Sequence, residues 1–209
     1  MPHIVSAFDS DLRSLQAKIA EMGGLAEELL AHALEALQRR DAELAEKVVA
    51  RDQALDRMEH ELERMSIRTL ALRQPMAVDL RETISALKIA STLERIGDLS
   101  KNIARRTKTL TQSQPVALTA PVARMGRQTL VQLTEVLDAY AARDTALAVA
   151  VWRKDVEVDE MYNSLFRELI TYMMEDSRTI SMCSQLMFVA KNLERIGDHT
   201  TFIAEMTYY

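Results

Sequence analysis

The chain has 209 residues, of which 48% are hydrophobic, 5% are aromatic and only 5 are glycine. This length allows one large domain or two small ones, and a composition so poor in aromatic residues and glycine favours long helices over strands and tight turns. The net charge of −5 arises from interspersed acidic and basic residues, so we expect neither nucleic acid nor direct membrane insertion. With the single cysteine Cys183, no charged-then-apolar leader and no apolar run of about 18 residues, a cytoplasmic setting is expected.

The first half of the chain shows the apolar periodicity of three long helices. Apolar residues at alternating steps of three and four predict one helix over 12–37. Asp41 is placed to cap a second helix with an apolar stripe over 44–72, and Pro75 is expected to end it. A third stripe runs over 80–103. Short turns between such helices make neighbours antiparallel, which predicts a three-helix bundle.

A segment rich in Thr, Gln, Ser and Pro separates this bundle from the rest of the chain. We interpret residues 111–121 as a linker between a first domain, 1–110, and a second domain, 122–209. After the linker the helical pattern returns, with helices expected at 123–142, 144–175 and roughly 179–208.

The two halves repeat each other residue by residue. Arg40-Asp41 recurs 103 positions later as Arg143-Asp144, and the run Leu-Glu-Arg-Ile-Gly-Asp recurs unchanged at 93–98 and 193–198. We therefore predict an all-α fold of six long helices, in two tandem three-helix bundles related by a pseudo-two-fold axis.

Pairs of carboxylates lie four residues apart at equivalent places in the two halves. The pairs are Asp52 with Asp56, Glu94 with Asp98, Asp155 with Asp159, and Glu194 with Asp198. Residues at this spacing share a helix face, about 5–6 Å apart at Cβ, where like charges repel. If the second and third helices of each half are adjacent, four carboxylates converge, and a hard cation such as Mg²⁺, Mn²⁺, Ca²⁺ or iron offsets their repulsion. The alternative is a solvated acidic face neutralised by arginines such as Arg95 and Arg195.

Each third helix contains a glycine next to its last acidic residue. Gly97 and Gly197 stand between Ile and Asp in the repeated run. A glycine inside a helix costs about 1 kcal/mol relative to alanine. Its repetition predicts that another group approaches the backbone closely at this point.

No pattern of a catalytic site is present in the sequence. It has no Gly-rich phosphate loop, no Ser–His–Asp order and no zinc-like spacing of Cys and His. A ferritin-like di-iron bundle uses Glu-x-x-His pairs, but the residues three positions before His32, His60 and His199 are not acidic. We expect no enzymatic activity. A structural adaptor, which needs none of the acidic pairs, is the alternative function.

The acidic motifs resemble those of the PhoU family, whose members are duplicated three-helix bundles with E/D-x-x-x-D motifs. Here the motifs read Asp52-Gln-Ala-Leu-Asp56, Glu94-Arg-Ile-Gly-Asp98, Asp155-Val-Glu-Val-Asp159 and Glu194-Arg-Ile-Gly-Asp198. Further matching segments are 73–81, at the second turn, and 190–199, near the end. The resemblance covers essentially the whole chain.

This resemblance implies a cytoplasmic, non-enzymatic repressor of the phosphate-starvation (Pho) response. It implies a homodimer that works with the ATPase of the phosphate ABC transporter and with a PhoR-type sensor histidine kinase. It also implies metal ions, with Mn, Mg, Fe and Zn as candidates, at the eight carboxylates of the motifs. Asn102 follows the first-half motif, whereas Phe202 stands at the equivalent position of the second half, so the second site is expected to be weaker or differently coordinated. The alternative remains a metal-independent helical adaptor or scaffold.

Overall fold

The computed structural model describes residues 2–73, 76, 78–112 and 118–208, and within them the side chains of all residues except 2–7 and 78. These residues form six long α-helices and one short 3-10 helix, with no strand. The elements are α1 (Pro2–Arg39), α2 (Ala42–Arg73), α3 (Val78–Thr111), α4 (Thr119–Ala142), α5 (Thr145–Glu175), η1 (Ser177–Thr179) and α6 (Ile180–Tyr208). The predicted all-α class with six long helices is confirmed.

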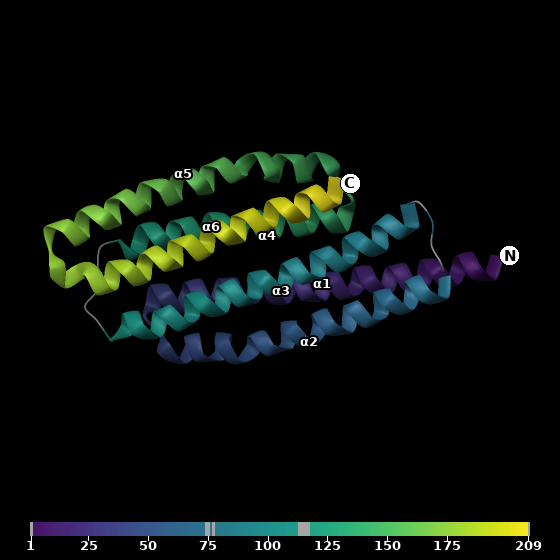
Figure 1. Ribbon diagram of the computed structural model, residues 1–209, viewed down its shortest axis with the longest axis horizontal. Coiled ribbons are helices and arrows are strands. Elements are labelled where there is room, and N and C mark those ends of the chain that lie inside the picture. The colour runs from purple at the N-terminus through teal and green to yellow at the C-terminus, as the bar shows by residue number, and fades with distance from the viewer. Residues whose placement is uncertain (1, 74–75, 77, 113–117, 209) are drawn as a thin grey trace.

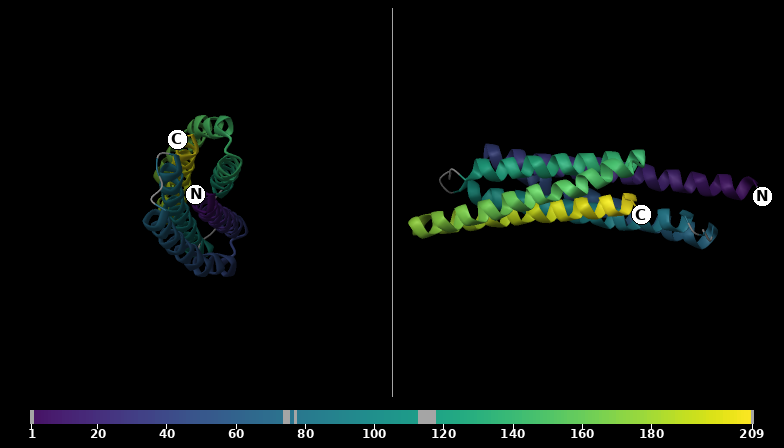
Figure 2. Two further views of the ribbon diagram at one scale, coloured as in Figure 1. Left: turned by 90° about the vertical axis from the view of Figure 1, so that its right-hand side faces the viewer. Right: turned by 90° about the horizontal axis from the view of Figure 1, so that it is seen from above.

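The helices form two three-helix bundles that pack against each other. Helices α1, α2 and α3 contact one another, as do α4, α5 and α6, while α1 also packs on α4 and α3 on α6. Figure 1 shows the result, with α2 and α5 at opposite outer edges and the other four helices between them. The end-on view in Figure 2 shows the same order. The pairs α2–α3 and α5–α6, which carry the acidic motifs, are therefore adjacent within each half.

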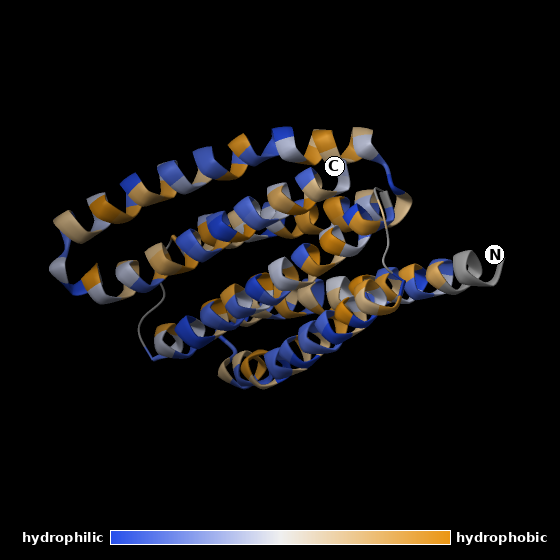
Figure 3. Ribbon diagram, turned by 45° about the vertical axis from the view of Figure 1, so that its right-hand side comes forward, coloured by the Kyte–Doolittle hydropathy of each residue, from blue (hydrophilic) through white to orange (hydrophobic). Residues whose placement is uncertain are grey.

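Burial of one apolar stripe per helix explains why these helices associate. Hydrophobic and hydrophilic residues alternate along every helix in Figure 3, as in amphipathic helices. Leu55, Leu93, Leu133 and Leu193 from both bundles are fully buried. Cys183 is also fully buried, which makes it a core residue. None of the described helices combines the length and apolar character that a membrane crossing requires.

Two equivalent turns join the first and second helices of each half. Arg40 and Arg143 adopt left-handed backbone conformations, with φ of 56° and 53°. The following residues cap the next helix, because Asp41 Oδ1 accepts the backbone N–H three residues on at 2.9 Å and Asp144 Oδ1 does so at 3.0 Å. The repeated Arg-Asp dipeptide thus ends one helix and begins the next.

The helices beside the linker extend further than the sequence pattern indicates. Helix α3 continues to Thr111 and α4 begins at Thr119. Pro121, which the sequence places in the linker, therefore lies in the first turn of α4. Proline is tolerated there because the first backbone N–H groups of a helix have no intrahelical acceptor. The expected end of the second helix at Pro75 lies outside the described residues; α2 itself ends at Arg73.

Reciprocal contacts between α1 and α4 relate the two halves. A Cβ atom at Gly23 would lie 3.0 Å from Leu137, and one at Gly126 would overlap Leu34. The two glycines are 103 positions apart, and so are the two leucines. Each helix therefore packs its leucine on the glycine of the other, which is the relation that a two-fold axis imposes.

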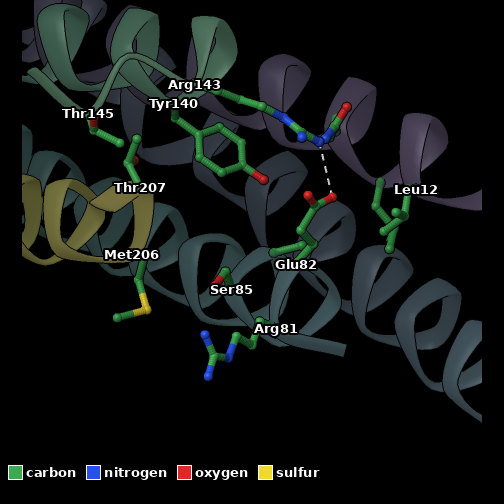
Figure 4. A pocket seen from close by; sticks show the side chains of 12 residues that line it. Leu12, Arg81, Glu82, Ser85, Tyr140, Arg143, Thr145, Met206 and Thr207 are labelled. Atoms are coloured by element: carbon green, nitrogen blue, oxygen red, sulfur yellow. Dashed lines mark hydrogen bonds and ion pairs between the residues drawn. The ribbon is translucent and has the colours of Figure 1, made fainter. Parts of the chain in front are cut away.

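The symmetry breaks where α3 meets α6. At one of two equivalent positions along the α3–α6 contact, Arg106 Nη1 donates to Gln185 Oε1 at 2.9 Å. The equivalent residues in the other half are Ser85 and Met206, and both line a cavity of about 250 Å³. Figure 4 shows this cavity, which Tyr140 also lines, with its hydroxyl on the side of Glu82. Smaller and more flexible side chains thus leave space at one of two equivalent positions.

Candidate functional site

The structure brings the predicted carboxylates together in two groups. We call Asp52, Asp56, Glu94 and Asp98, on α2 and α3, the first centre, and Asp155, Asp159, Glu194 and Asp198, on α5 and α6, the second centre.

In the first centre the carboxylates influence one another electrostatically. Burial raises the pKa of Asp52, and the charges of Asp56 and Asp98 act in the same direction, whereas a hydrogen bond from Lys101 opposes them. Burial also raises the pKa of Glu94, with further contributions from Asp98 and Asp56. The four groups therefore lie within electrostatic reach of one another.

The second centre shows a stronger effect. Burial, together with the negative charges of Asp159, Asp198 and Glu194, raises the pKa of Asp155 to about 6. The pKa of Asp198 is raised by burial and then by the charges of Glu194 and Asp159. Four acidic groups thus share one face of the α5–α6 pair.

The close approach expected at the repeated glycines is present in both centres. A Cβ atom at Gly97 would lie 2.5 Å from Leu55 Cδ2 and 3.1 Å from Asp52 Oδ1. A Cβ atom at Gly197 would lie 3.0 Å from Asp155 Oδ1. Glycine therefore allows an aspartate of the neighbouring helix to place its carboxylate against the backbone of α3 or α6.

A lysine pairs with two carboxylates of the first centre. Lys101 Nζ lies 2.5 Å from Asp52 Oδ2 and also pairs with Asp98 Oδ1, so it bridges α2 and α3. Its side chain is 17% exposed. The equivalent residue of the second half is Thr201, whose hydroxyl donates to the backbone carbonyl of Asp198 at 2.7 Å.

The second centre contains a buried amide instead. Gln132 on α4 is fully buried, and neither its Oε1 nor its Nε2 has a hydrogen-bond partner among the described residues. Its Oε1 lies 3.9 Å from the position of a Cβ atom on Gly197, beside Asp155. The equivalent residue of the first half is Leu29, which is apolar.

The donor set of these centres suits a hard metal ion. In the part of the chain that the structure describes, Asp52 Oδ1 and both polar atoms of Gln132 are buried without a hydrogen-bond partner, and a buried polar atom without a partner costs about 1–3 kcal/mol. Carboxylate and amide oxygens are the usual ligands of Mg²⁺, Mn²⁺ and Ca²⁺. The residues present therefore fit a metal ion, and the second centre fits best because it offers both kinds of oxygen.

A tighter cluster lies elsewhere on α2. This cluster consists of Glu59, His60 and Glu63, whose potential metal-ligand atoms all lie within 4.8 Å of one another. Among the described residues it is the group of three or more His, Cys, Asp or Glu side chains that meets this distance. His60 Nδ1 is 2.7 Å from Glu59 Oε2. The sequence interpretation missed this cluster, although a histidine flanked by acids one residue before and three residues after it was a visible signal. The carboxylates of the two centres do not gather this closely in the present conformation.

Comparison with known proteins identifies the family of the chain. The sequence profile of the PhoU domain matches residues 19–107 and 122–207. The chain belongs to the PhoU family. A relative from Caulobacter vibrioides, a phosphate-specific transport system accessory protein PhoU homolog, is 51% identical over 208 residues, covering 99% of this chain and 90% of the relative.

Solved PhoU structures have the same fold. The crystal structure of PhoU from Pseudomonas aeruginosa matches with a TM-score of 0.95 and 39% identity, covering 97% of each chain. The phosphate transport system regulatory protein PhoU from Streptococcus pneumoniae matches with a TM-score of 0.90 and 31% identity, covering 97% of this chain and 95% of that one.

Each of the two PhoU-domain matches contains one acidic centre. Two residues of these centres escaped the sequence interpretation, Lys101 and Gln132. Their signal was a difference between the repeats, Lys101 against Thr201 and Gln132 against Leu29. In the sequence, nothing links these differences to the acidic centres. The structure makes the link, because it places both residues beside a carboxylate.

Proposed function

We propose that the chain is a cytoplasmic, non-enzymatic regulator of phosphate transport that represses the phosphate-starvation (Pho) response when phosphate is plentiful. The observation that carries this proposal is the nearly full-length similarity to the accessory protein homolog of Caulobacter vibrioides. The name of the Streptococcus pneumoniae structure, a regulatory protein of phosphate transport, agrees with it.

The proposed regulator acts through protein partners. These are the ATPase of the phosphate ABC transporter and a PhoR-type sensor histidine kinase. Deletion of the gene is expected to derepress a phosphate-starvation reporter in phosphate-rich medium, and re-expression to restore repression. Purified ATPase and the kinase's cytoplasmic part are expected to retain the chain in pull-downs. An unchanged reporter in the deletion strain would contradict the proposal.

The chain is expected to catalyse no phosphoryl transfer or hydrolysis by itself. The test is an assay of the purified protein for phosphatase and ATPase activity, with Asp98→Asn and Asp198→Asn as comparisons. Activity that co-purifies with the protein and disappears in either variant would overturn this part of the proposal.

The acidic centres are proposed to bind divalent or iron-type metal ions, with Mn²⁺, Mg²⁺, Fe²⁺ and Zn²⁺ as candidates. Support comes from the unpaired buried oxygens and from the mutual repulsion of the carboxylates. Calorimetric titration is expected to show binding that weakens when Asp155 or Asp198 becomes asparagine, and chelation is expected to lower the melting temperature by linkage. Equal and weak responses from wild type and variants would favour the metal-independent adaptor.

The chain is also proposed to form a homodimer. Support comes from exposed apolar side chains at the tips of both bundles, including Ile67, Leu72 and Met76 in one half and Met174 and Ile180 in the other. Light scattering is expected to give twice the chain mass of 23.6 kDa. A monomer mass across a wide concentration range, with and without metal, would contradict the dimer.

A further inference from the structure

The two acidic centres share their carboxylates but differ at several neighbouring positions, two of which bear directly on cation binding. Lys101 in the first half corresponds to Thr201, and Leu29 corresponds to Gln132. Because the carboxylates of the two centres lie on equivalent helices, each centre serves as an internal comparison for the other.

Lys101 places a positive charge where a metal ion would bridge the helices of the first centre. Its ammonium group contacts Asp52 from α2 and Asp98 from α3 at once. Charge-assisted hydrogen bonds of this kind are roughly twice as strong as neutral ones. Asp52, one of the two acidic partners of Lys101, is almost completely buried, with a side chain that is 2% exposed. A metal ion entering here must first displace this ammonium group.

In the second centre a lysine pairs with only one of the four carboxylates, within the part of the chain that the structure describes. Within the described part of the chain, Asp155, Asp159 and Asp198 take part in no ion pair. Two lysines stand nearby, but Lys191 pairs with Glu194 at 2.6 Å and Lys154 pairs with Glu135 at 2.8 Å.

Residue 201 cannot supply the missing charge, because it is a threonine with its hydroxyl bonded to the Asp198 backbone. Among the described residues, the aspartates from α5 and α6 thus face each other without an ion pair, although the charges of Lys191 and Arg195 act on Asp198 from nearby.

Gln132 gives independent evidence that this centre is built for a ligand. A fully buried amide with both polar atoms unpaired is rare, because most buried polar groups have a partner. The amide lies at the position where the first half has leucine, and its oxygen is directed to the same point of α6 as Asp155 Oδ1. A bound cation contacts the oxygen of Gln132 and the carboxylates together. A purely structural role for Gln132 does not explain why its amide oxygen is buried without a partner beside the carboxylates.

We propose that the two centres have different occupants: Lys101 serves as the built-in cation of the first centre, whereas the second centre binds a divalent metal ion with Gln132 as an additional oxygen ligand. The inference rests on the metal-binding function proposed above and makes it specific to one half. It narrows the expectation of one metal site per bundle to a site in the second half. Of the two outcomes expected from Phe202, a weaker or a differently coordinated second site, it favours different coordination.

Exchanging residues between the repeats tests the proposal with Mn²⁺ as the probe. Thr201→Lys is expected to remove high-affinity Mn²⁺ binding, measured by calorimetry on the full chain. Lys101→Thr is expected to add binding in the first half, seen as a higher stoichiometry. Gln132→Leu is expected to weaken Mn²⁺ about 10-fold or more, as for other groups that support a metal site.

The location of the metal ion is the second measurement. Mn²⁺ is expected to broaden amide NMR signals of α5 and α6 in the wild-type protein, and those of α2 and α3 only in Lys101→Thr. A trivalent probe, Tb³⁺, gives an optical check, because the single tryptophan Trp152 lies one helical turn before Asp155. Terbium emission on tryptophan excitation is expected in wild type and is expected to be lost in Thr201→Lys and in Trp152→Phe.

Gln132→Leu also distinguishes the loss of a metal ligand from damage to the fold. Without metal this variant is expected to be at least as stable as wild type, because it removes two unpaired buried polar atoms, while its Mn²⁺ affinity falls. Equal Mn²⁺ binding by wild type, Gln132→Leu and Thr201→Lys would overturn the assignment of the second centre and leave metal binding as such intact. Absence of Mn²⁺ binding in wild type and in Lys101→Thr would instead contradict the metal function itself.

Discussion

Glycine residues in these helices have opposite roles according to what lies beside them. Gly126 faces Leu34 across the interface between the halves, and a methyl group added there would overlap that leucine. Gly24, also within a helix, has no neighbouring atom within 4 Å of a Cβ atom. The same residue type is thus required by packing at one position and merely tolerated at the other.

Alanine substitutions at these two glycines are expected to change stability in opposite directions. Gly126→Ala is expected to lower the free energy of unfolding by about 1–3 kcal/mol, because overpacking outweighs the gain in helix propensity. Gly24→Ala is expected to raise it by up to about 1 kcal/mol, since only the propensity changes. Urea denaturation of both variants measures the difference, and a stabilised Gly126→Ala would show that Leu34 can move aside.

Tyr140 provides a test of burial through pH. Burial raises the pKa of its phenol from 10.0 to about 12. Below pH 10 the phenol is neutral in both the folded and the unfolded chain, so its full contribution to stability is present. Between pH 10 and 12 the unfolded chain releases a proton that the folded chain retains, and stability falls by at most about 3 kcal/mol.

Tyr140→Phe is expected to remove this part of the alkaline destabilisation. The measurement is the free energy of unfolding of wild type and Tyr140→Phe from pH 9 to 12, in which the difference between the two proteins should change with pH. Parallel curves would show that the phenol titrates as it does in the unfolded chain.

At the scale of helices, the repeated Arg-Asp turn determines where α1 and α4 end and where α2 and α5 begin. The left-handed conformation of Arg40 and Arg143 is unusual for a residue with a side chain. Helix capping by Asp41 and Asp144 accompanies it in both turns. Both halves therefore use the same turn, and this turn makes the two helices that it joins antiparallel.

Asp144→Ala is expected to destabilise the protein by about 1 kcal/mol, within a range of roughly 0.5–2, because the N–H of Leu147 loses its acceptor. Asp144→Ser is the matched control, since serine also caps helices well. Thermal unfolding followed by circular dichroism compares them. A serine variant as unstable as the alanine variant would show that charge, rather than the cap, matters here.

At the scale of the whole molecule, the reciprocal interface couples the two bundles. Leu34 of the first half is 4% exposed and packs on Gly126 of the second. Helices α3 and α6 form a second line of contact between the halves. We therefore expect the two bundles to unfold together.

The single tryptophan reports on the second half alone, whereas circular dichroism reports on all helices. In wild type the denaturation curves from both signals are expected to coincide. Leu34→Ala is expected to cost about 2–5 kcal/mol and to shift the Trp152 fluorescence curve although the mutation lies in the other half. A fluorescence curve that stays in place while circular dichroism becomes biphasic would show independent bundles.

The sequence by itself determined the class of fold, the number of long helices and the internal repeat. Periodic apolar stripes and the Arg-Asp dipeptides are local signals, and local physical chemistry is enough to interpret them. The eight acidic residues of the two centres were also visible, because their spacing along a helix fixes their face. The close approach at Gly97 and Gly197 followed from the cost of glycine in a helix.

Only the tertiary structure decided what surrounds those acidic residues. Lys101 meets Asp52 across 49 positions of sequence, and Gln132 reaches the second centre from a third helix, α4. The position of Pro121 inside a helix also depended on the actual start of α4. These facts depend on how helices pack side by side, and a one-dimensional pattern defines the face of each helix but not the residue that a neighbouring helix brings to it.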